Sequence, residues 1–184
     1  AKEYAWVHLE RVISNVKRVM GDSNWEFECD GGKYKPEEVS ALILGKLVKD
    51  AQIAVGEEVR DVVITCPAYF GFGKRMATKL AGEIAGLNVL AVLPEPTAAA
   101  LAYGIEQKQD QTILVYDLGG GTFDVTLLQI KGKDFTVIST GGDDKLGGKD
   151  WDEAIVAFLA EEFSAQTGTP ANNLIEDPET YQGL

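Results

Sequence analysis

The chain has 184 residues, 17 of them basic and 29 acidic, so its formal net charge is −12. At roughly 150 residues per domain this length predicts about one domain, and an apolar content of 45% is sufficient for a hydrophobic core. The acidic balance argues against a nucleic-acid partner, because phosphate contacts need a basic face, and no apolar run approaches the roughly 20 residues of a membrane span.

The first third of the chain predicts a helix, a hairpin and a second helix. Apolar residues recur at steps of three and four over 5–20, which predicts a helix ending at Gly21. Alternation on both sides of the Asp30-Gly31-Gly32 turn predicts a hairpin over 25–35. Pro36 and two following acids suit the first turn of a helix, which we expect to run to Val55.

The remainder predicts alternating strands and helices, and then a hairpin. Short β-branched runs separated by helical stretches are typical of parallel βαβ units. An antiparallel hairpin and an acidic amphipathic helix follow, with Ile155, Phe158 and Leu159 expected on the buried side of that helix. After residue 166 we expect a loop and the start of another helix. In order, the predicted ranges are 61–65, 75–86, 89–93, 96–103, 113–116, 124–130, 135–140 and 150–163.

The strongest candidate site is a triple-glycine turn between two aspartates. Asp117 lies near the end of a predicted strand, Gly119–Gly121 form the turn, and Thr122 and Asp124 lead into the next strand. Glycines let backbone N–H groups close around an anion, and carboxylates beside a phosphate call for Mg²⁺. A hairpin with capping aspartates is the alternative, but the two aspartates make us favour phosphate binding. The sequence contains neither a Walker A motif nor GxGxxG.

Two further segments could contribute to such a site. Glu95 lies between Pro94 and Pro96 at a strand-to-helix junction, where the prolines fix the direction of the backbone. It could also serve only as a first-turn acid. A second glycine-rich turn over 141–148 opens onto a helix N-terminus, a common place for anions, although it could be merely a loop with tight turns.

Several motifs together resemble one family. Asp117–Asp124 is similar to the second phosphate motif of the actin-like ATPases, and Val62–Phe70, Glu95–Gly104 and Leu146–Asp152 resemble the same family in the same order. The chain thus resembles the nucleotide-binding domain of the seventy-kilodalton heat-shock chaperones (DnaK type). The resemblance implies an α/β fold: a partial actin-like (ribonuclease-H-like) ATPase domain, with a mixed sheet and helices. Because the chain starts at Ala1 in mid-pattern, we expect it to be part of a longer protein.

The resemblance assigns roles to twelve residues. Lys17 would act on the γ-phosphate and the attacking water, although from its residue type alone it is an ordinary solvated lysine. Glu95 would order the metal shell and the water, and Asp117 and Asp124 would hold Mg²⁺, largely through water. Pro67 and Arg75 would relay the nucleotide state. The residues expected to contact ATP or ADP are Gly119, Gly120, Gly121, Thr122, Gly147 and Gly148, with the Thr122 hydroxyl close to the γ-phosphate.

The sequence departs from the family pattern at three places. Gly71-Phe72-Gly73 replaces a polar turn, Pro94 replaces an asparagine, and Cys66 replaces a small apolar residue. The first two lie close to Arg75 and Glu95, so the relay could be tuned differently in this chain. Cys66 and Cys29 have neither metal-site nor disulfide spacing, and a reducing cytoplasm is the expected compartment.

The resemblance also implies the function and the domain organisation. The parent protein would hydrolyse ATP to control binding and release of unfolded client peptides, with a J-domain cochaperone and a nucleotide exchange factor as partners. We expect this chain alone to be inactive and to dimerise through exposed strand edges. The alternatives are a sugar-kinase or filament relative of the same superfamily, and a non-catalytic truncated homologue. The expected subdomains are residues 1–60 and 61–115 in lobe I, outer and inner, and 116–150 and 151–184 in lobe II, inner and outer.

Overall fold

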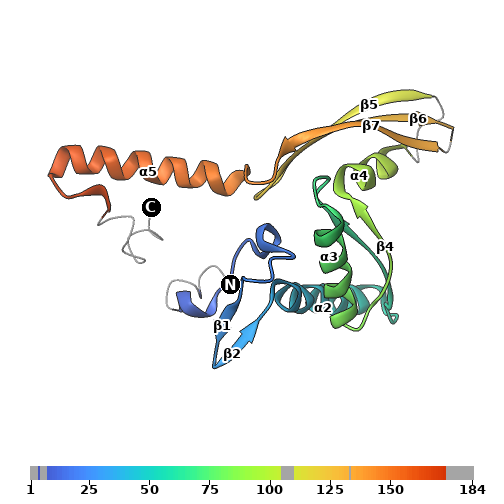
Figure 1. The fold of residues 1–184 in the computed structure, drawn as a ribbon, viewed down its shortest axis with the longest axis horizontal. Coiled ribbons are helices and arrows are strands. Elements are labelled where there is room, and N and C mark those ends of the chain that lie inside the picture. The colour runs from blue at the N-terminus through green and yellow to red at the C-terminus, as the bar shows by residue number, and fades with distance from the viewer. Residues whose placement is uncertain (1–3, 5–7, 105–109, 133, 173–184) are drawn as a thin grey trace.

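A computed structural model describes residues 4, 8–104, 110–132 and 134–172 (Figure 1). The N-terminal part contains two 3₁₀ helices, a small hairpin and a long helix: η1 (Leu9–Arg11), η2 (Val16–Val19), β1 (Phe27–Cys29), β2 (Gly32–Tyr34) and α2 (Pro36–Val55). The central part alternates strands and helices: β3 (Asp61–Cys66), α3 (Phe72–Ile84), β4 (Asn88–Pro94) and α4 (Glu95–Gly104). The C-terminal part is β5 (Gln111–Leu118), β6 (Phe123–Lys131), β7 (Asp134–Asp143) and α5 (Gly148–Thr167).

The predicted helix over 5–20 is wrong for the residues that the structure describes there. Only η1 and η2 are helical, and the backbone between them is irregular. Asn15, just before η2, has φ 56° and ψ 29°, a left-handed conformation that a right-handed α-helix cannot contain. The apolar spacing was helical, but this residue interrupts the backbone.

The hairpin and the second helix are confirmed. β1 and β2 pair antiparallel around the predicted turn. Helix α2 begins at Pro36, and the Glu38 carboxylate accepts a hydrogen bond from the Lys35 N–H at 2.8 Å. It ends before Gly56, whose φ of 73° is the left-handed conformation that terminates helices.

The predicted parallel unit is confirmed for β3, α3 and β4. The two strands pair parallel, and α3 crosses between them. Gly82 lets the helix approach closely, since a Cβ there would lie 2.5 Å from Val89 Cγ2 and 2.7 Å from Ile64 Cδ1. In the described part of the chain this sheet has only two strands. Dimerisation through its edges stays a prediction.

The third predicted strand of that unit does not join it. β5 pairs antiparallel with β6 along its whole length, and β6 pairs antiparallel with β7. The parallel prediction is therefore wrong for β5, because the tight turn after Leu118 folds the chain back on itself without a crossover. In the described residues, the β3–β4 sheet is parallel, and the β1–β2 and β5–β6–β7 sheets are antiparallel. The predicted α/β class is confirmed.

Helix α4 packs against one face of the β5–β6–β7 sheet (Figure 1). Every second residue of β6 is buried on this face: Asp124, Thr126, Leu128 and Ile130. Such alternation is the period-two pattern of a strand with one covered face. A carboxylate therefore lies at the end of an otherwise apolar and hydroxyl-lined face.

Helix α5 is confirmed and projects away from the sheet (Figure 1). The expectation that Ile155, Phe158 and Leu159 are buried is wrong, since they are 58%, 60% and 41% exposed. The physical reason is that, among the described residues, α5 is held mainly at its first turn. No helix in the described residues is both long and apolar enough to cross a membrane.

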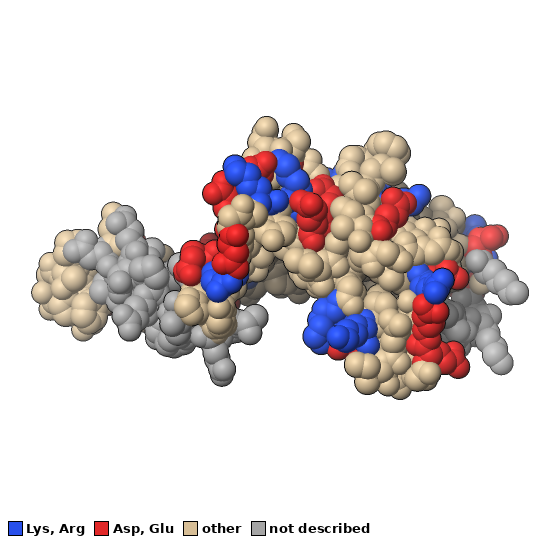
Figure 2. Space-filling view, turned by 90° about the horizontal axis from the view of Figure 1, so that it is seen from below, with Lys and Arg blue, Asp and Glu red and all other residues tan. Residues whose placement is uncertain are grey.

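Charged side chains of both signs lie side by side on the face seen in Figure 2. Elsewhere in the structure, ion pairs join residues one helical turn apart, such as Lys46 with Asp50 on α2 and Lys149 with Glu153 on α5. Exposed pairs of this kind contribute little to stability.

Candidate functional site: a glycine turn with its N–H groups on one side

The site is built around the turn that connects β5 and β6. Asp117 and Asp124 are direct partners in the antiparallel register, so the hairpin itself brings the two carboxylates together. The Gly119 N–H donates to the Thr122 carbonyl at 2.9 Å and closes the turn. The Thr122 side chain is buried beside it.

Three consecutive carbonyl groups of the turn accept hydrogen bonds from the start of α5 and from η2. Two accept backbone N–H groups from the start of α5, and the third accepts a guanidinium N–H from η2. The pairs are Gly148 N–H to Gly119 O at 3.0 Å, Lys149 N–H to Gly120 O at 3.0 Å and Arg18 Nε to Gly121 O at 3.0 Å.

This arrangement fixes the direction of the peptide N–H groups. In a trans peptide the C=O and N–H point in opposite directions, and the described chain has no cis peptide bond. Holding the carbonyls of residues 119–121 therefore turns the N–H groups of Gly120, Gly121 and Thr122 to the opposite side. Within the described residues these three N–H groups donate no hydrogen bond. Such a row of unpaired N–H groups is suited to an anion.

The predicted nucleotide-contacting glycines of the second turn lie against the first one. The Gly147 N–H donates to the Asp150 carboxylate at 2.8 Å, and the Gly148 N–H is used by Gly119. A Cβ on Gly147 would lie 2.5 Å from both Gly120 C and Gly121 N. In this structure both residues support the turn from behind. Their direct contact with nucleotide stays a prediction.

Asp124 has the properties expected of a cation-binding carboxylate. It is fully buried, and its Oδ1 accepts the Ala68 N–H at 3.0 Å. Its Oδ2 is buried and has no hydrogen-bond partner in the part of the chain that the structure describes. Burial raises the pKa of Asp124; the Ala68 hydrogen bond and Lys17 oppose this, while the negative charges of Glu95 and Asp117 add to it. A buried carboxylate oxygen without a partner has a strong need for a donor or a cation.

The donor set fits Mg²⁺. The described residues contain no group of three or more His, Cys, Asp or Glu side chains placed to hold a metal directly. Mg²⁺ typically binds through one or two carboxylates and completes its shell with waters and phosphate oxygens. Asp117 and Asp124 beside the N–H row meet that description.

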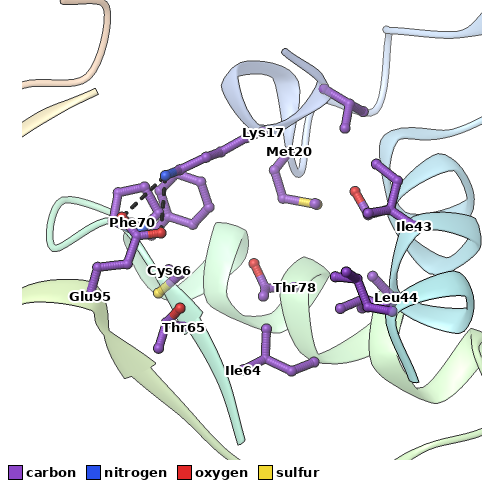
Figure 3. Close-up of a pocket in the computed structure, with 15 residues that line it drawn as sticks. Lys17, Met20, Ile43, Leu44, Ile64, Thr65, Cys66, Phe70, Thr78 and Glu95 are labelled. Carbon is purple, nitrogen blue, oxygen red and sulfur yellow. Dashed lines mark hydrogen bonds and ion pairs between the residues drawn. The ribbon is translucent and has the colours of Figure 1, made fainter. Parts of the chain in front are cut away.

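The Lys17 ammonium forms an ion pair with both carboxylate oxygens of Glu95 (Figure 3). The Lys17 ammonium lies 3.0 Å from Glu95 Oε1 and 3.1 Å from Oε2. Glu95 is the first residue of α4 and Lys17 belongs to η2, so the fold joins positions 78 residues apart. Both line a cavity of about 400 Å³. Sequence reasoning from the residue type gave Lys17 no partner, whereas the structure assigns it one.

The sequence matches the family described as "Hsp70 protein" over residues 2–182. The chain belongs to the Hsp70 family. The family implies an actin-like ATPase fold, and its members are heat-shock chaperones that bind nucleotide, clients and cochaperones. This result favours the chaperone interpretation over the sugar-kinase and filament alternatives.

In this Hsp70-family chain, Arg75 braces the segment that follows β3. Its Nε donates to the Phe70 carbonyl at 2.6 Å, and its Nη2 donates to the Ala68 carbonyl at 3.3 Å. Because the Ala68 N–H holds Asp124, Arg75 is two contacts away from the buried carboxylate. Pro67 is fully buried in the same segment. A relay through Pro67 and Arg75 stays a prediction.

The cysteine that departs from the family pattern also lies at this Hsp70 site. Cys66 is 1% exposed and lines the same cavity as Lys17 and Glu95 (Figure 3). Burial raises the pKa of its thiol, so the thiol is neutral and inert under ordinary conditions.

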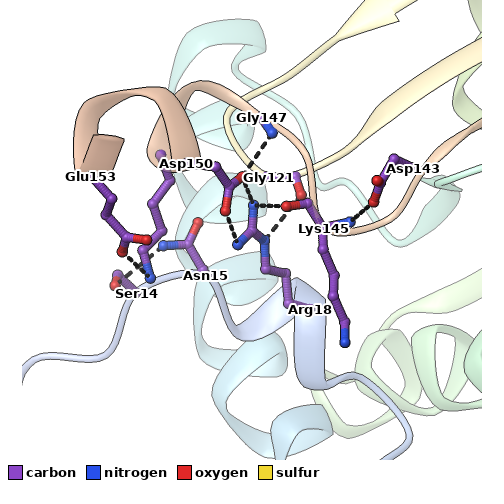
Figure 4. Close-up of polar contacts among 10 residues, drawn as sticks. Ser14, Asn15, Arg18, Gly121, Asp143, Lys145, Gly147, Asp150 and Glu153 are labelled. Carbon is purple, nitrogen blue, oxygen red and sulfur yellow. Dashed lines mark hydrogen bonds and ion pairs between the residues drawn. The ribbon is translucent and has the colours of Figure 1, made fainter. Parts of the chain in front are cut away.

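Sequence reasoning missed Arg18. Its guanidinium donates to both carboxylate oxygens of Asp150, 3.0 Å for Nη1 to Oδ1, and Nη2 also reaches the Lys145 carbonyl at 3.3 Å (Figure 4). The hydrogen bond to Arg18 is the main cause that lowers the pKa of Asp150. A single arginine next to Lys17 carries no sequence signal of this role, because its partners lie more than a hundred residues away.

Proposed function

We propose that this chain binds ATP and ADP with Mg²⁺ at the Gly119–Thr122 turn, as part of a chaperone ATPase. The observation that carries the proposal is the row of three N–H groups beside the buried Oδ2 of Asp124, none of which has a hydrogen-bond partner among the described residues. The N–H groups suit phosphate oxygens and the carboxylate suits the cation.

Charge makes the cation necessary. The chain has a net charge of −12. Asp117 and Asp124 flank the turn, and the negative charge of Glu95 acts on Asp124. A phosphate brought to these carboxylates without a cation would be repelled strongly in a partly buried site. We therefore expect nucleotide affinity to depend on Mg²⁺, which would neutralise phosphate charge when bound.

Each remaining residue has a defined task in this proposal. The N–H groups of Gly120, Gly121 and Thr122 would orient the phosphates, and the Thr122 hydroxyl would act on the γ-phosphate. Lys17 contributes positive charge where the transferred phosphoryl group becomes most negative, while Glu95 holds that ammonium in place. Phosphoryl transfer needs mainly such positioning and charge neutralisation.

The proposal extends to the coupling expected for the family. The nucleotide state would control binding and release of unfolded peptides through Pro67 and Arg75, with a J-domain cochaperone and a nucleotide exchange factor setting the cycle. We place this activity in the cytoplasm and in the stress response. The bracing of residues 68 and 70 by Arg75 supports the proposed route.

The test is the substitution Lys17→Ala in the full-length protein that carries these residues. Single-turnover ATP hydrolysis should fall about 100-fold or more, the usual loss for a group acting on transition-state charge. The Kd for ATP should change less than about threefold, since the interaction develops mainly in the transition state.

Lys46→Ala is the matched control. Lys46 also pairs with a carboxylate, Asp50, but on the exposed surface of α2. Its removal should leave hydrolysis unchanged. A Lys17→Ala rate within about threefold of wild type would refute the catalytic assignment. Absence of Mg²⁺-dependent nucleotide binding in the wild-type protein would refute the site itself.

A further inference from the structure

We propose that Arg18 is a positioning residue for phosphate binding, which holds the Gly121–Thr122 peptide so that the Thr122 N–H faces the anion. The inference rests on the proposed function of the turn and adds a residue to it. Arg18 would not touch the phosphate, because its guanidinium lies on the carbonyl side of the turn.

The three peptides of the turn are held in two different ways. The carbonyls of Gly119 and Gly120 are bound by backbone N–H groups at the start of α5. Among the described residues, the carbonyl of Gly121 accepts a hydrogen bond from the Arg18 side chain alone. Therefore the direction of the third N–H, that of Thr122, depends on a single side chain.

The guanidinium is itself firmly held. Arg18 donates through separate nitrogens to Gly121 and to both oxygens of Asp150, a fork that a planar guanidinium can satisfy and an ammonium cannot (Figure 4). Its side chain is 19% exposed. Asp150 in turn accepts the Gly147 N–H at 2.8 Å, so the same carboxylate fixes the arginine and the start of α5.

The position of Arg18 in the chain gives this contact a second consequence. Lys17, its neighbour in η2, is bound to Glu95 on α4, while Arg18 is bound to the turn between β5 and β6. One short 3₁₀ helix thus connects the proposed catalytic pair to the proposed phosphate turn. A shift of η2 would move both at once.

The test uses the 184-residue chain with ¹⁵N-labelled glycine and threonine, titrated with magnesium pyrophosphate. In wild type the amide signals of Gly120, Gly121 and Thr122 should all shift. In Arg18→Ala the affinity should fall about tenfold, the expected loss for one charge-assisted contact, and the Thr122 shift should be reduced most. Arg18→Lys keeps the charge but lacks the fork, so most of the same loss should appear.

Arg11→Ala is the control, because Arg11 also pairs with an aspartate, Asp30, but in an exposed position away from the turn. It should behave as wild type. Equal pyrophosphate affinity and equal Thr122 shifts in wild type and both Arg18 variants would overturn the inference. A merely structural role would lower all three amide responses in parallel, and that result would overturn it too.

Failure of the proposed function would look different. If no amide of the turn responds to pyrophosphate in wild type, the phosphate site is refuted. The Arg18 contact is then tested by comparing the Thr122 amide signal of the variants in the absence of an anion. The Thr122 amide signal should move in Arg18→Ala and stay fixed in Arg11→Ala, and an unmoved signal would overturn the inference.

Discussion

Gly147 is the position where a single methyl group should separate the phosphate turn from α5. Its φ of −169° is ordinary extended backbone, so alanine would suffer no strain of its own. The obstacle is contact: the added Cβ would lie 2.5 Å from Gly120 C and Gly121 N. Normal carbon contacts begin near 3.5 Å, so the turn would have to move by about 1 Å.

A movement of that size would break the two hydrogen bonds between α5 and the turn. Both are 3.0 Å long, and an added ångström takes them beyond hydrogen-bond range. Each is worth about 1 kcal/mol net, so we expect the docked arrangement to lose about 2 kcal/mol. Since α5 is held mainly at its first turn, this loss should appear as local opening and not as global unfolding.

Amide hydrogen exchange at Lys149 measures this opening. Its N–H donates to Gly120, and a 2 kcal/mol loss corresponds to about 30-fold faster exchange. Gly148→Ala is the matched control, because a Cβ there would lie 3.7 Å from Gly120 Cα, an ordinary contact. Alanine also favours the helix relative to glycine, so exchange should be unchanged or slower. Equal Lys149 exchange in the two variants would refute the reasoning.

Two further predictions concern the neighbours of the turn. Arg75→Ala should leave basal ATP hydrolysis in the full-length protein near normal but weaken ATP-driven peptide release and, reciprocally, peptide stimulation of hydrolysis; unchanged coupling would contradict the relay. The Arg18 contact lowers the pKa of Asp150 below its usual 3.8. The stabilisation of the folded state by this ion pair is therefore present above pH 3.8, and it is lost as the pH falls through the lowered pKa of Asp150 in the folded state. The Gly147 amide shift should titrate in that acid range and become flat in Asp150→Asn; a midpoint at or above 3.8 would contradict the pairing.

The elements that the sequence predicted well are those with local start and stop signals. Pro36 and Gly56 mark both ends of α2, and the Asp30-Gly31-Gly32 turn fixes the first hairpin. The β5–β6 turn was found for the same reason, since three glycines between two aspartates are visible in the sequence alone. What was not visible is which strands share a sheet, because pairing depends on contacts distant in sequence. β5 was assigned to the parallel unit on its length and order only.

In the candidate site, too, contacts between residues close in sequence were predictable, and contacts between distant residues were not. Asp117 and Asp124 are register partners across one turn, so sequence distance and spatial distance agree. Lys17 and Glu95 are 78 residues apart, and only the family resemblance suggested that they belong together. Sequence reasoning assigned no role to Arg18. Its role follows from three partners supplied by the turn, by α5 and by the loop that precedes it.

The segment 5–20, which was wrongly predicted to be one helix, carries the two site residues whose positions depend on tertiary contacts, Lys17 and Arg18. A continuous α-helix over 5–20 would have fixed the directions of Lys17 and Arg18 by the helix axis alone. Instead Asn15 takes a left-handed conformation, and a single 3₁₀ turn follows. Successive side chains in a 3₁₀ helix point about 120° apart, which lets Lys17 reach Glu95 while Arg18 reaches the glycine turn. Local preference for a helix is overridden at a position where two adjacent charges must face two different elements, and such conflicts are expected at functional sites.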